Sequence, residues 1–358
     1  MLKHLLFSLL FISMSYSQTE NTVAPKNEKG KIVLFGEAHF VKEKYDEMKA
    51  FIFEKLENLS SKEKVTIFFE LPSSLNYAIS RIKEDQDTTL FKEWFNHVYK
   101  AKEKKPSFFW TDYKAFILSL LEYAEKKDIQ LELKCIDVEL EFRRTAFILS
   151  SFKTKLNSKM DSLIQKEHIP KNSAIRTTLL NYVNELALIS TDPYELEVLK
   201  ALQVSLLIDC TICRKRDRFL YDRFKKYYDP TDAMVFGTFG LAHVINKPDF
   251  SKVSEFFKID HKVDTTNHKS MSKFMTTDFN DKIFRVGIIA LQHNLRLSDY
   301  QKPVDYSYIM NTEERNYIKT LFKDKEVLRL YPYEHKVLSN LASNLDYLIV
   351  YKSSNYRY

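Results

Sequence analysis

The chain has 358 residues, of which 44% are hydrophobic and 29% are charged, and this composition is typical of a folded globular protein with one large domain or two modest ones. It excludes disordered, collagen-like and low-complexity proteins. The formal net charge is +7, but basic and acidic residues alternate along the chain without forming a basic stripe, so we expect no nucleic-acid partner.

Residues 1–17 have the features of a secretory signal peptide. Lys3 precedes an apolar run at 5–14, and small residues follow it. Because this run is too short to span a bilayer, we expect no stable membrane anchor after signal removal, and a periplasmic or secreted protein. Residues 18–29 are polar and are predicted to form a flexible lead-in to a single α/β domain at 31–358.

The first part of this domain alternates short apolar runs with segments of helical spacing. Strands are predicted at Lys31–Phe35, Val65–Phe69 and Leu131–Ile136, and helices at 41–59, 74–99 and 113–127. Such alternation indicates a mainly parallel sheet with crossover helices on both faces. The carboxyl ends of parallel strands meet at one edge, where open sheets bind their ligands. The three predicted strands deliver Glu37, Glu70 and Asp137 to that edge.

Residues 139–228 are almost wholly helical in pattern, and we interpret them as a large helical insertion. A helical pattern that starts near Pro193 and runs to about Tyr228 is unusually long for a globular protein unless it is kinked. Three more strands are predicted at Ala233–Phe236, Ile283–Leu291 and Tyr347–Lys352. The second of them ends beside His293, which is a candidate substrate contact.

The chain contains only 5 glycines, and two of them open G-x-x-H tetrapeptides at strand ends. The tetrapeptides are Gly36-Glu37-Ala38-His39 and Gly240-Leu241-Ala242-His243. A glycine at a strand end is expected to turn the chain sharply and to place the following side chains above the sheet edge. A lone histidine after a strand is more often a capping or core residue. Two in the same pattern favour a shared site that contains His39 and His243.

Two chemistries suit a site built from His39, His243 and Glu70. Imidazole and carboxylate ligands bind Zn, Mn or Co and leave positions open for a water, whose pKa the metal lowers. Without a metal, either histidine could take the proton from water itself, with Glu37 or Glu70 fixing its tautomer. The residues alone leave both chemistries open.

An arginine-rich helical segment, Arg214 to Arg223, precedes the fourth predicted strand. A guanidinium that reaches a carboxylate-rich site can clamp a substrate carbonyl or stabilise an oxyanion. Charge runs on helices are also commonly solvated faces with i,i+4 ion pairs. The spacing alone does not decide which arginine points inward.

The order of these motifs resembles a known superfamily. GEAH, FFELP, CIDVE, RDRFL and GTFGLAH follow one another over 31–246 as in the superfamily that holds erythromycin esterases, ChaN-type haem-binding proteins and the TraB/TIKI/GumN group. The resemblance implies one pocket lined by Glu37, His39, Glu70, Arg216 and His243. Asp137 resembles the acidic residue that closes the third strand in the esterase branch.

The resemblance does not select a branch. The esterase branch, which implies a metal-free histidine base, spaces its first Glu and His by one residue more than Glu37 and His39 do. The ChaN branch, which implies haem, has an acidic residue and an amide residue directly after its histidine, where this chain has Phe40 and Val41. The TraB/TIKI spacing matches best and implies a divalent metal, with His39, Glu70 and His243 as its ligands.

The sequence therefore predicts a secreted hydrolase that cleaves an ester or amide bond of a small-molecule or peptide substrate with activated water. The alternative is a non-enzymatic carrier of haem or another small ligand on the same fold. In the hydrolase hypothesis the catalytic residues are Glu37, His39, Glu70, His243 and Arg216, the last as an electrophilic clamp. Asp137 and His293 are the candidate substrate contacts.

Overall fold

The computed structural model describes residues 31–39, 41–96, 108–139, 142–155, 173–208, 214–246, 269–292, 306 and 309–354. The predicted signal peptide, the lead-in at 18–29 and His293 lie outside the described residues. Among the described helices, none combines the length and the apolar character that crossing a bilayer requires.

The described strands form one sheet in the order β3-β2-β4-β1-β5-β7-β6. They are β1 (Ile32–Glu37), β2 (Lys64–Pro72), β3 (Gln130–Asp137), β4 (Met234–Gly240), β5 (Ile283–Ala290), β6 (Val327–Leu330) and β7 (Tyr347–Tyr351). Every neighbouring pair is parallel except β6 and β7, which run antiparallel at one edge. The predicted α/β class with a mainly parallel sheet is confirmed.

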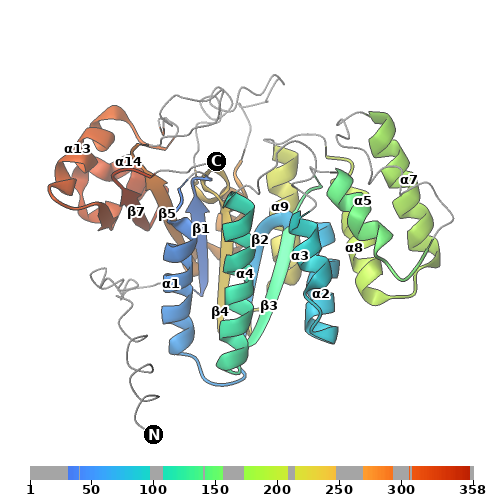
Figure 1. Cartoon of the computed structure of the whole chain (residues 1–358). Helices are drawn as coiled ribbons and strands as arrows, with labels where there is room; N and C mark the ends of the chain where they lie inside the picture. Colours follow the sequence, from blue (N-terminus) through green and yellow to red (C-terminus); the bar gives the residue numbers. More distant parts are fainter. Residues whose placement is uncertain are drawn as a thin grey trace, which may run out of the picture.

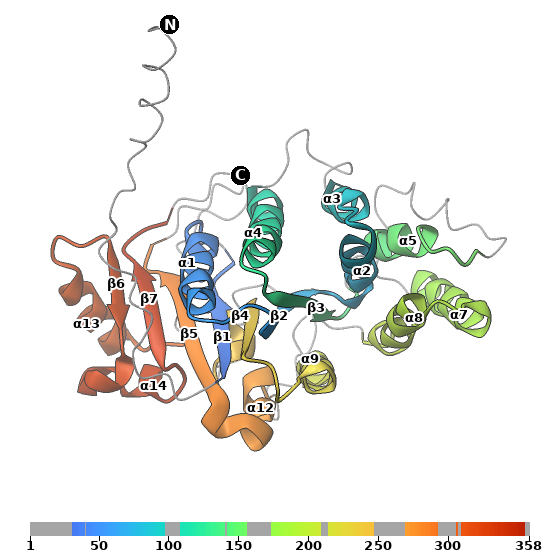
Figure 2. The same cartoon turned by 90° about the horizontal axis from the view of Figure 1, so that it is seen from below.

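Helices cover both faces of this sheet (Figure 1). In the view of Figure 2, α1 (Lys44–Glu57) and α4 (Phe108–Lys126) lie on one face, and α9 (Arg214–Tyr227) and α12 (Met271–Phe279) lie on the other. Toward and beyond the β3 edge lie α2 (Asn76–Asp85), α3 (Thr89–Asn96), α5 (Phe142–Ser150), α7 (Ser173–Ile189) and α8 (Pro193–Ser205). Shorter or peripheral segments are η1 (Ser73–Leu75), α10 (Leu241–Val244), α13 (Thr312–Phe322) and α14 (Ser339–Ala342).

The central strands are buried on both faces, which explains their continuous apolar runs. All 6 residues of β1 are buried. On one face Phe35 packs against Phe51 of α1, with ring centroids 5.2 Å apart. On the other face Phe68 of β2 packs against Phe224 of α9 at 4.4 Å. A strand covered by helices on both sides carries apolar side chains at successive positions rather than in alternation.

The predicted insertion over 139–228 is helical and returns to the sheet. Its described helices are α5, α7, α8 and α9, and the long pattern from Pro193 divides into α8, which ends at Ser205, and α9, which begins at Arg214. Because Phe224 of α9 packs on β2, the last helix of the insertion belongs to the layer that covers this face. Strand β6 is not predicted from the sequence, because its 4 residues are too few to show a period.

The strand order places the four motif-bearing strands next to one another. The chain runs from β1 out to β2 and β3, returns to insert β4 between β1 and β2, and then continues on the other side of β1 with β5. Strands β3, β2, β4 and β1 are therefore consecutive neighbours, with their carboxyl ends at one edge. Ligands of open α/β sheets bind where the strand order reverses in this way.

Glycine at these strand ends provides space rather than an unusual backbone. No described glycine has a positive φ, and Gly240 has a φ of −56°, so the expected sharp turn is not the reason for glycine here. A Cβ on Gly36 would lie 2.8 Å from Leu241 Cδ1 and 3.0 Å from Val244 Cβ. The bare backbone at Gly36 thus lets α10, which carries His243, lie directly against β1.

We expect Gly36→Ala to reduce the free energy of unfolding by about 1–3 kcal/mol, because added atoms in a close-packed interior force their neighbours to move. Those neighbours belong to α10, so the NMR signals of His243 should also shift. Urea unfolding and histidine NMR spectra measure the two effects. In the control Gly287→Ala, the Cβ would meet Leu345 and Leu348 on the β7 side of the sheet, so stability should fall while His243 stays in place. An undisturbed His243 in Gly36→Ala would contradict this packing.

Candidate active site

Buried charged side chains occupy the carboxyl ends of β1 to β4. Strand β1 ends at Glu37, β3 ends at Asp137, and β2 has an irregular register around Glu70. His243 follows β4 on α10, and Arg216 comes from α9 in the helical insertion. The structure therefore brings together residues from five elements that are far apart in the sequence.

The guanidinium of Arg216 joins two of these strand ends. Its Nε and Nη2 donate to the two carboxylate oxygens of Asp137 at 2.8 and 2.6 Å, and Nη2 also donates to Glu70 Oε1 at 2.6 Å. Charge-assisted, bidentate pairs of this kind are among the strong hydrogen bonds in proteins. Only 6% of the Arg216 side chain is exposed, whereas Arg218 is 56% exposed and pairs with Asp222 on the surface.

His243 lies between two carboxylates. Its Nδ1 is 2.7 Å from Asp217 Oδ1, and its Nε2 is 3.2 Å from Glu70 Oε1. Burial alone would lower the pKa of this imidazole, but the two carboxylates outweigh burial and raise the pKa to about 10. At neutral pH, His243 is therefore an imidazolium that donates to both carboxylates. In this state it is a source of positive charge rather than a base.

Asp217 is a site residue that the sequence analysis does not single out. It is fully buried and accepts from the Met271 backbone N–H at 2.8 Å, in addition to its contact with His243. Through these two contacts, the Asp217 carboxylate connects the first residue of α12 to His243. The available signal is its position directly after Arg216 in the RDRFL motif, one of the segments that carry the resemblance.

At the end of β1, Glu37 contacts a histidine and a lysine. His39 Nδ1 is 2.6 Å from Glu37 Oε1, and Lys44 Nζ donates to Glu37 Oε2 at 2.5 Å. Burial favours the neutral imidazole of His39, but the carboxylates of Glu37 and Glu70 outweigh it and raise the pKa of His39. The side chain of His39 is 39% exposed, against 8% for His243, so His39 is the more accessible histidine.

Lys44 is a second residue that the sequence analysis does not identify. Its side chain is wholly buried, and burial lowers the pKa of its ammonium against the opposing effect of Glu37. A buried ammonium is costly unless it is paired. The signal in the sequence is spacing. Lys44 precedes Met48 by one helical turn and Ile52 by two, so it lies on the apolar stripe of α1 that faces the core.

The two halves of the site meet at Gly240. Its backbone N–H donates to Glu70 Oε2, and a Cβ on this glycine would lie 3.2 Å from both Glu70 Oε2 and His39 Nε2. The missing side chain is what lets His39 approach Glu70. We call the side chains linked in this way the ionic network. Its members are Glu37, His39, Lys44, Glu70, Asp137, Arg216, Asp217 and His243.

The ionic network balances its charge when both histidines are protonated. Its carboxylates then face an ammonium, a guanidinium and two imidazolium groups. Although burial raises the pKa of Glu70, His243 and Arg216 outweigh burial and hold that pKa well below its usual range. Loss of any one cation would leave a buried carboxylate uncompensated.

A further buried carboxylate lies behind Asp137. Glu139 accepts from the backbone N–H and the hydroxyl of Ser74 at 2.8 and 2.9 Å, and from the hydroxyl of Thr145 at 2.7 Å. Burial raises the pKa of Glu139 to about 7. These contacts join the end of β3 to η1 and α5, and so support the strand end that carries Asp137.

The arrangement does not fit a divalent metal on His39, Glu70 and His243. Metal ligation needs imidazole nitrogens and carboxylate oxygens that are available to the ion. Both ring nitrogens of His243 face carboxylates, and the two oxygens of Glu70 already accept from Arg216 and from Gly240. Among the described residues, no group of three or more His, Cys, Asp or Glu is arranged to hold a metal ion. Because both ring nitrogens of His243 face carboxylates, this residue does not offer a nitrogen to a haem iron either.

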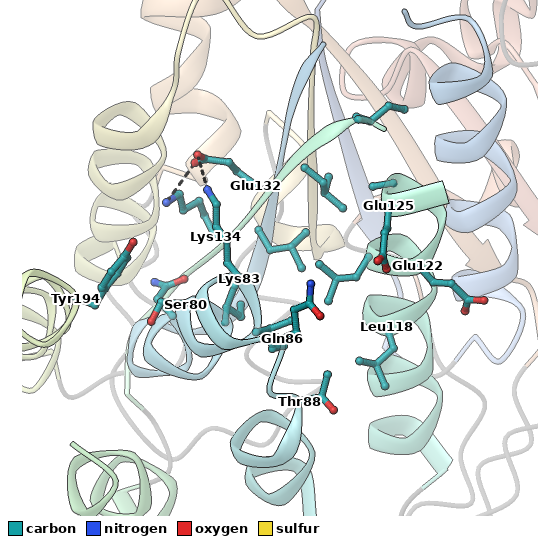
Figure 3. Close-up of a pocket in the computed structure, with 18 of the residues that line it drawn as sticks. Ser80, Lys83, Gln86, Thr88, Leu118, Glu122, Glu125, Glu132, Lys134 and Tyr194 are labelled. Carbon is teal, nitrogen blue, oxygen red and sulfur yellow. Dashed lines mark hydrogen bonds and ion pairs between the residues drawn. The ribbon is translucent and has the colours of Figure 1, made fainter. Parts of the chain in front are cut away.

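A pocket of about 620 Å³ lies elsewhere, against β3 between α2 and α4 (Figure 3). Gln86 and Leu118 line it, and Lys83 and Lys134 each lie 3.4 Å from Glu132 along its wall. No member of the ionic network lines this pocket. The candidate site therefore rests on the cluster of charged side chains at the strand ends and not on this cavity.

Solved structures share the fold of this chain. A point mutant of the erythromycin esterase EreC in its open conformation superposes with a TM-score of 0.53 over 92% of this chain and 92% of its own, at 12% sequence identity. A protein from Bacillus cereus gives 0.54 over 92% and 90%, at 12% identity. A succinoglycan biosynthesis protein gives 0.53 over 91% and 88%, at 9% identity. Neither models of known families nor the sequences of curated proteins match the chain.

A haem-binding ChaN of Campylobacter jejuni superposes with a TM-score of only 0.36, which is too low to indicate a common fold. The superposition on EreC shows that the chain shares the fold of that esterase, and the other two structures share the fold of the chain as well. The resemblance to this superfamily that the motif order indicates is thus confirmed at the level of the fold. The roles of the site residues and the branch of the superfamily stay predictions.

We expect the free energy of unfolding to fall as the pH rises from about 6.5 toward 10. The pKa of His243 is about 10 in the folded chain and about 6.5 in the unfolded chain. Its stabilising contribution is therefore complete below pH 6.5 and is lost as the pH rises through 10, with a slope of at most about 1.4 kcal/mol per pH unit. Urea unfolding across this range measures the slope.

His243→Gln should flatten this dependence on pH. His335→Gln, which changes a histidine outside the ionic network, should leave it as it is. A slope in His243→Gln equal to that of the unmodified chain would show that His243 is not the group that titrates.

Arg216→Met should reduce the free energy of unfolding by about 3–5 kcal/mol, because it leaves the buried carboxylates of Asp137 and Glu70 without their cation. The matched control is Arg218→Met on the same helix, which breaks an exposed pair with Asp222 and cation–π contacts with Tyr221 and Phe274 but leaves no buried carboxylate without its cation, so it should cost about 1 kcal/mol or less. Urea unfolding at pH 7 compares the two variants. Equal losses would mean that the Arg216 contacts do not hold the strand ends together.

Proposed function

We propose that the chain is a hydrolase in which His39 activates water against an ester or amide carbonyl. The observation that carries the proposal is the pair of Glu37 and His39 at the accessible end of the ionic network. The contact of His39 Nδ1 with Glu37, at 2.6 Å, assigns the proton to Nδ1 and makes Nε2 the nitrogen that accepts a proton. With 39% of its side chain exposed, His39 can be reached by water and by a substrate.

In the proposed reaction, His39 takes a proton from water while the water oxygen attacks the carbonyl carbon. Glu37 stabilises the imidazolium that forms, through the hydrogen bond that already orients the ring. As the tetrahedral intermediate collapses, the bond from the carbonyl carbon to the ester oxygen or amide nitrogen breaks, and His39 returns the proton to that leaving atom. This order conserves protons and needs no group beyond the chain, the water and the substrate.

Negative charge develops on the carbonyl oxygen, and the cations of the ionic network are suited to oppose it. His243 is an imidazolium at neutral pH, since its pKa is about 10, but both of its N–H groups face carboxylates, so it would act through its positive charge and not through a hydrogen bond to the oxyanion. Fixed positive charge in a buried site stabilises an oxyanion more than it would in water. The Arg216 guanidinium already donates to Asp137 and Glu70. We therefore propose that Arg216 and Asp137 hold Glu70 in place and do not contact the substrate directly.

Ester hydrolysis is the first reaction to test, because EreC, a neighbour of the same fold, is an esterase by name. We propose a small-molecule or peptide substrate and no nucleic acid. The helical insertion supplies Arg216 and Asp217 through α9, so we further propose that its other helices shape the substrate pocket. Secretion or a periplasmic location remains part of the proposal and rests on the features of residues 1–17.

His39→Ala should lower kcat/KM for the chain's ester or amide substrate by about 10²–10⁴-fold, the usual contribution of a general base. For the unmodified chain, kcat/KM should rise with pH through the raised pKa of His39, because the base must be neutral to accept a proton. Panels of esters and peptides assayed with the purified mature chain test both points. His335→Ala is the control and should keep full activity. Undiminished hydrolysis by His39→Ala would reject the proposal.

Metal dependence and haem binding are decided in the same preparation. We expect hydrolysis to survive a chelator and to gain nothing from added Mn, Zn or Co, because the oxygens of Glu70 are already engaged. A strict requirement for one of these ions would instead support a metal on His39, Glu70 and His243. In a titration with haemin, a Soret shift without any hydrolysis would favour the carrier alternative.

A further inference from the structure

We propose that the pocket of about 620 Å³ beside β3 binds a short extended peptide, which pairs with the free edge of that strand. The peptide is of a class in which apolar and acidic side chains alternate. The volume lies in the range of pockets that hold small ligands. Because no member of the ionic network lines the pocket, this binding site goes beyond the proposed hydrolysis.

One row of backbone groups on β3 faces away from the sheet, because β3 is an edge strand. On the β2 side, the Gln130 N–H donates to the Glu63 carbonyl oxygen at 3.0 Å. Successive residues of a strand direct their N–H and C=O groups to opposite edges. The groups of Leu131, Leu133 and Cys135 therefore point outward, and the two leucines line the pocket.

An asparagine side chain already pairs with this edge. Asn76 Nδ2 donates to the Cys135 carbonyl oxygen at 2.7 Å, and Asn76 Oδ1 accepts from the Cys135 N–H at 2.8 Å. A residue of a neighbouring strand makes the same two hydrogen bonds. Asn76 also lines the pocket, so the outward groups of β3 are directed at the space that the pocket occupies.

The groups that precede Cys135 on this edge are open. The described part of the chain offers no hydrogen-bond partner on this side to the Leu131 carbonyl oxygen or to the N–H and carbonyl oxygen of Leu133. The Leu131 N–H is engaged, since it donates to the Ile129 carbonyl oxygen at 3.0 Å. Leu133 is only 5% exposed, and unpaired backbone groups at buried positions are costly. An extended peptide would satisfy them by adding a strand to the edge.

The open stretch suits a short peptide rather than a second copy of the chain. Asn76 closes it at Cys135, and the local hydrogen bond of Leu131 closes it at the other end. Helices α2 and α8 lie beyond β3 (Figure 2), where the sheet of a second copy would have to approach. The pocket itself reaches solvent beside Lys83, whose side chain is 66% exposed.

The two faces of the sheet give the pocket an apolar wall and a charged wall. Leu133 belongs to the apolar core, and Leu118 of α4 packs against that core and lines the pocket. Glu132 and Lys134 point to the opposite face, where Lys134 Nζ lies 5.0 Å from the ring centroid of Tyr227 of α9. Figure 3 shows Leu118 and Lys134 on opposite sides of the pocket. Because paired strands align their side chains face by face, alternate peptide residues would meet the two walls.

The charges of the second wall favour acidic residues in the peptide. Lys83 and Lys134 share the carboxylate of Glu132, and each Nζ lies 3.4 Å from it. Two ammonium groups on one carboxylate leave this wall with a net positive charge. The other carboxylates that line the pocket are Glu122 and Glu125, which lie across it on α4 (Figure 3), and Glu197, which lies 3.9 Å from Lys226.

The probe is the blocked pentapeptide acetyl-Val-Glu-Val-Glu-Val-amide, titrated into the purified chain by calorimetry. We expect a Kd below about 1 mM, and binding at least about threefold weaker for the analogue with Lys in place of Glu, because its charges are reversed. Hydrogen exchange should slow at the Leu133 N–H and stay unchanged at the Glu132 N–H, which faces β2. Absence of binding, binding without protection of Leu133, or equal binding of the Lys analogue would overturn the proposal.

N-methylated peptides test the pairing itself, since N-methylation removes a donor and leaves the side chains as they are. In an extended peptide the valine N–H groups face one edge and the glutamate N–H groups the other. Methylation of one set should weaken binding by about tenfold or more, and methylation of the other set should weaken it far less. The sensitive set also gives the direction of the peptide. Equal weakening by both sets would rule out strand pairing.

Ser80→Leu should fill part of the pocket and weaken peptide binding by about tenfold or more, because the lost space excludes a peptide side chain. The matched control is Ser119→Leu. Each hydroxyl donates to the carbonyl oxygen three residues earlier, at 2.8 Å for Ser80 and 2.7 Å for Ser119, but only Ser80 lines the pocket. Ser119→Leu should bind the peptide as the unmodified chain does.

Leu118→Lys keeps the proposal testable if Ser80→Leu does not fold. It places a charge on the partly exposed apolar wall and should likewise weaken peptide binding. Peptide binding that either folded variant leaves unchanged would place the peptide outside this pocket and overturn the proposal. Hydrolysis by His39 should persist in both variants, since neither residue contacts the ionic network. A chain that binds the peptide and hydrolyses nothing would support this site and reject the proposed function.

Discussion

The site depends on one buried carboxylate, Glu70, which receives donors from three separate parts of the chain. Arg216 arrives from the helical insertion, the Gly240 N–H from the end of β4, and His243 from the short helix that follows. A carboxylate buried this deeply is tolerated only when its partners are held in place. Glu70 therefore couples the strand ends to the insertion electrostatically, while the apolar strands behind them supply the rigid support.

The two histidines begin from the same G-x-x-H pattern and reach different electrostatic environments. His39 is partly exposed and shares Glu37 with Lys44, whereas His243 is buried between Asp217 and Glu70. The tetrapeptide places each imidazole at a strand end, but the partners come from other elements. The four-residue motif therefore locates the site. It does not tell which histidine is the proposed proton acceptor and which carries the fixed positive charge.

Local patterns are sufficient to predict most of the sheet, because strands buried on both faces appear as continuous apolar runs. They also locate Glu37, His39, Glu70, Asp137 and His243, since each follows such a run. Lys44 and Asp217 escape prediction because the contacts that define them are made across the fold rather than along the chain. The role of glycine at Gly36 is likewise visible only in three dimensions, as the space that a Cβ would take from α10.

The division of the insertion has a consequence for how the protein can change. Helix α9 contributes Arg216 and Asp217 to the ionic network, whereas α5, α7 and α8 contribute none of its members. Of these, α5 supports the end of β3 through the contact of Thr145 with the buried carboxylate of Glu139, so we expect only α7 and α8 to tolerate exchange or lengthening without disturbing the buried charges. The replaceable part of the insertion is thus its outer pair of helices, and a graft between proteins of this fold should keep both α5 and α9.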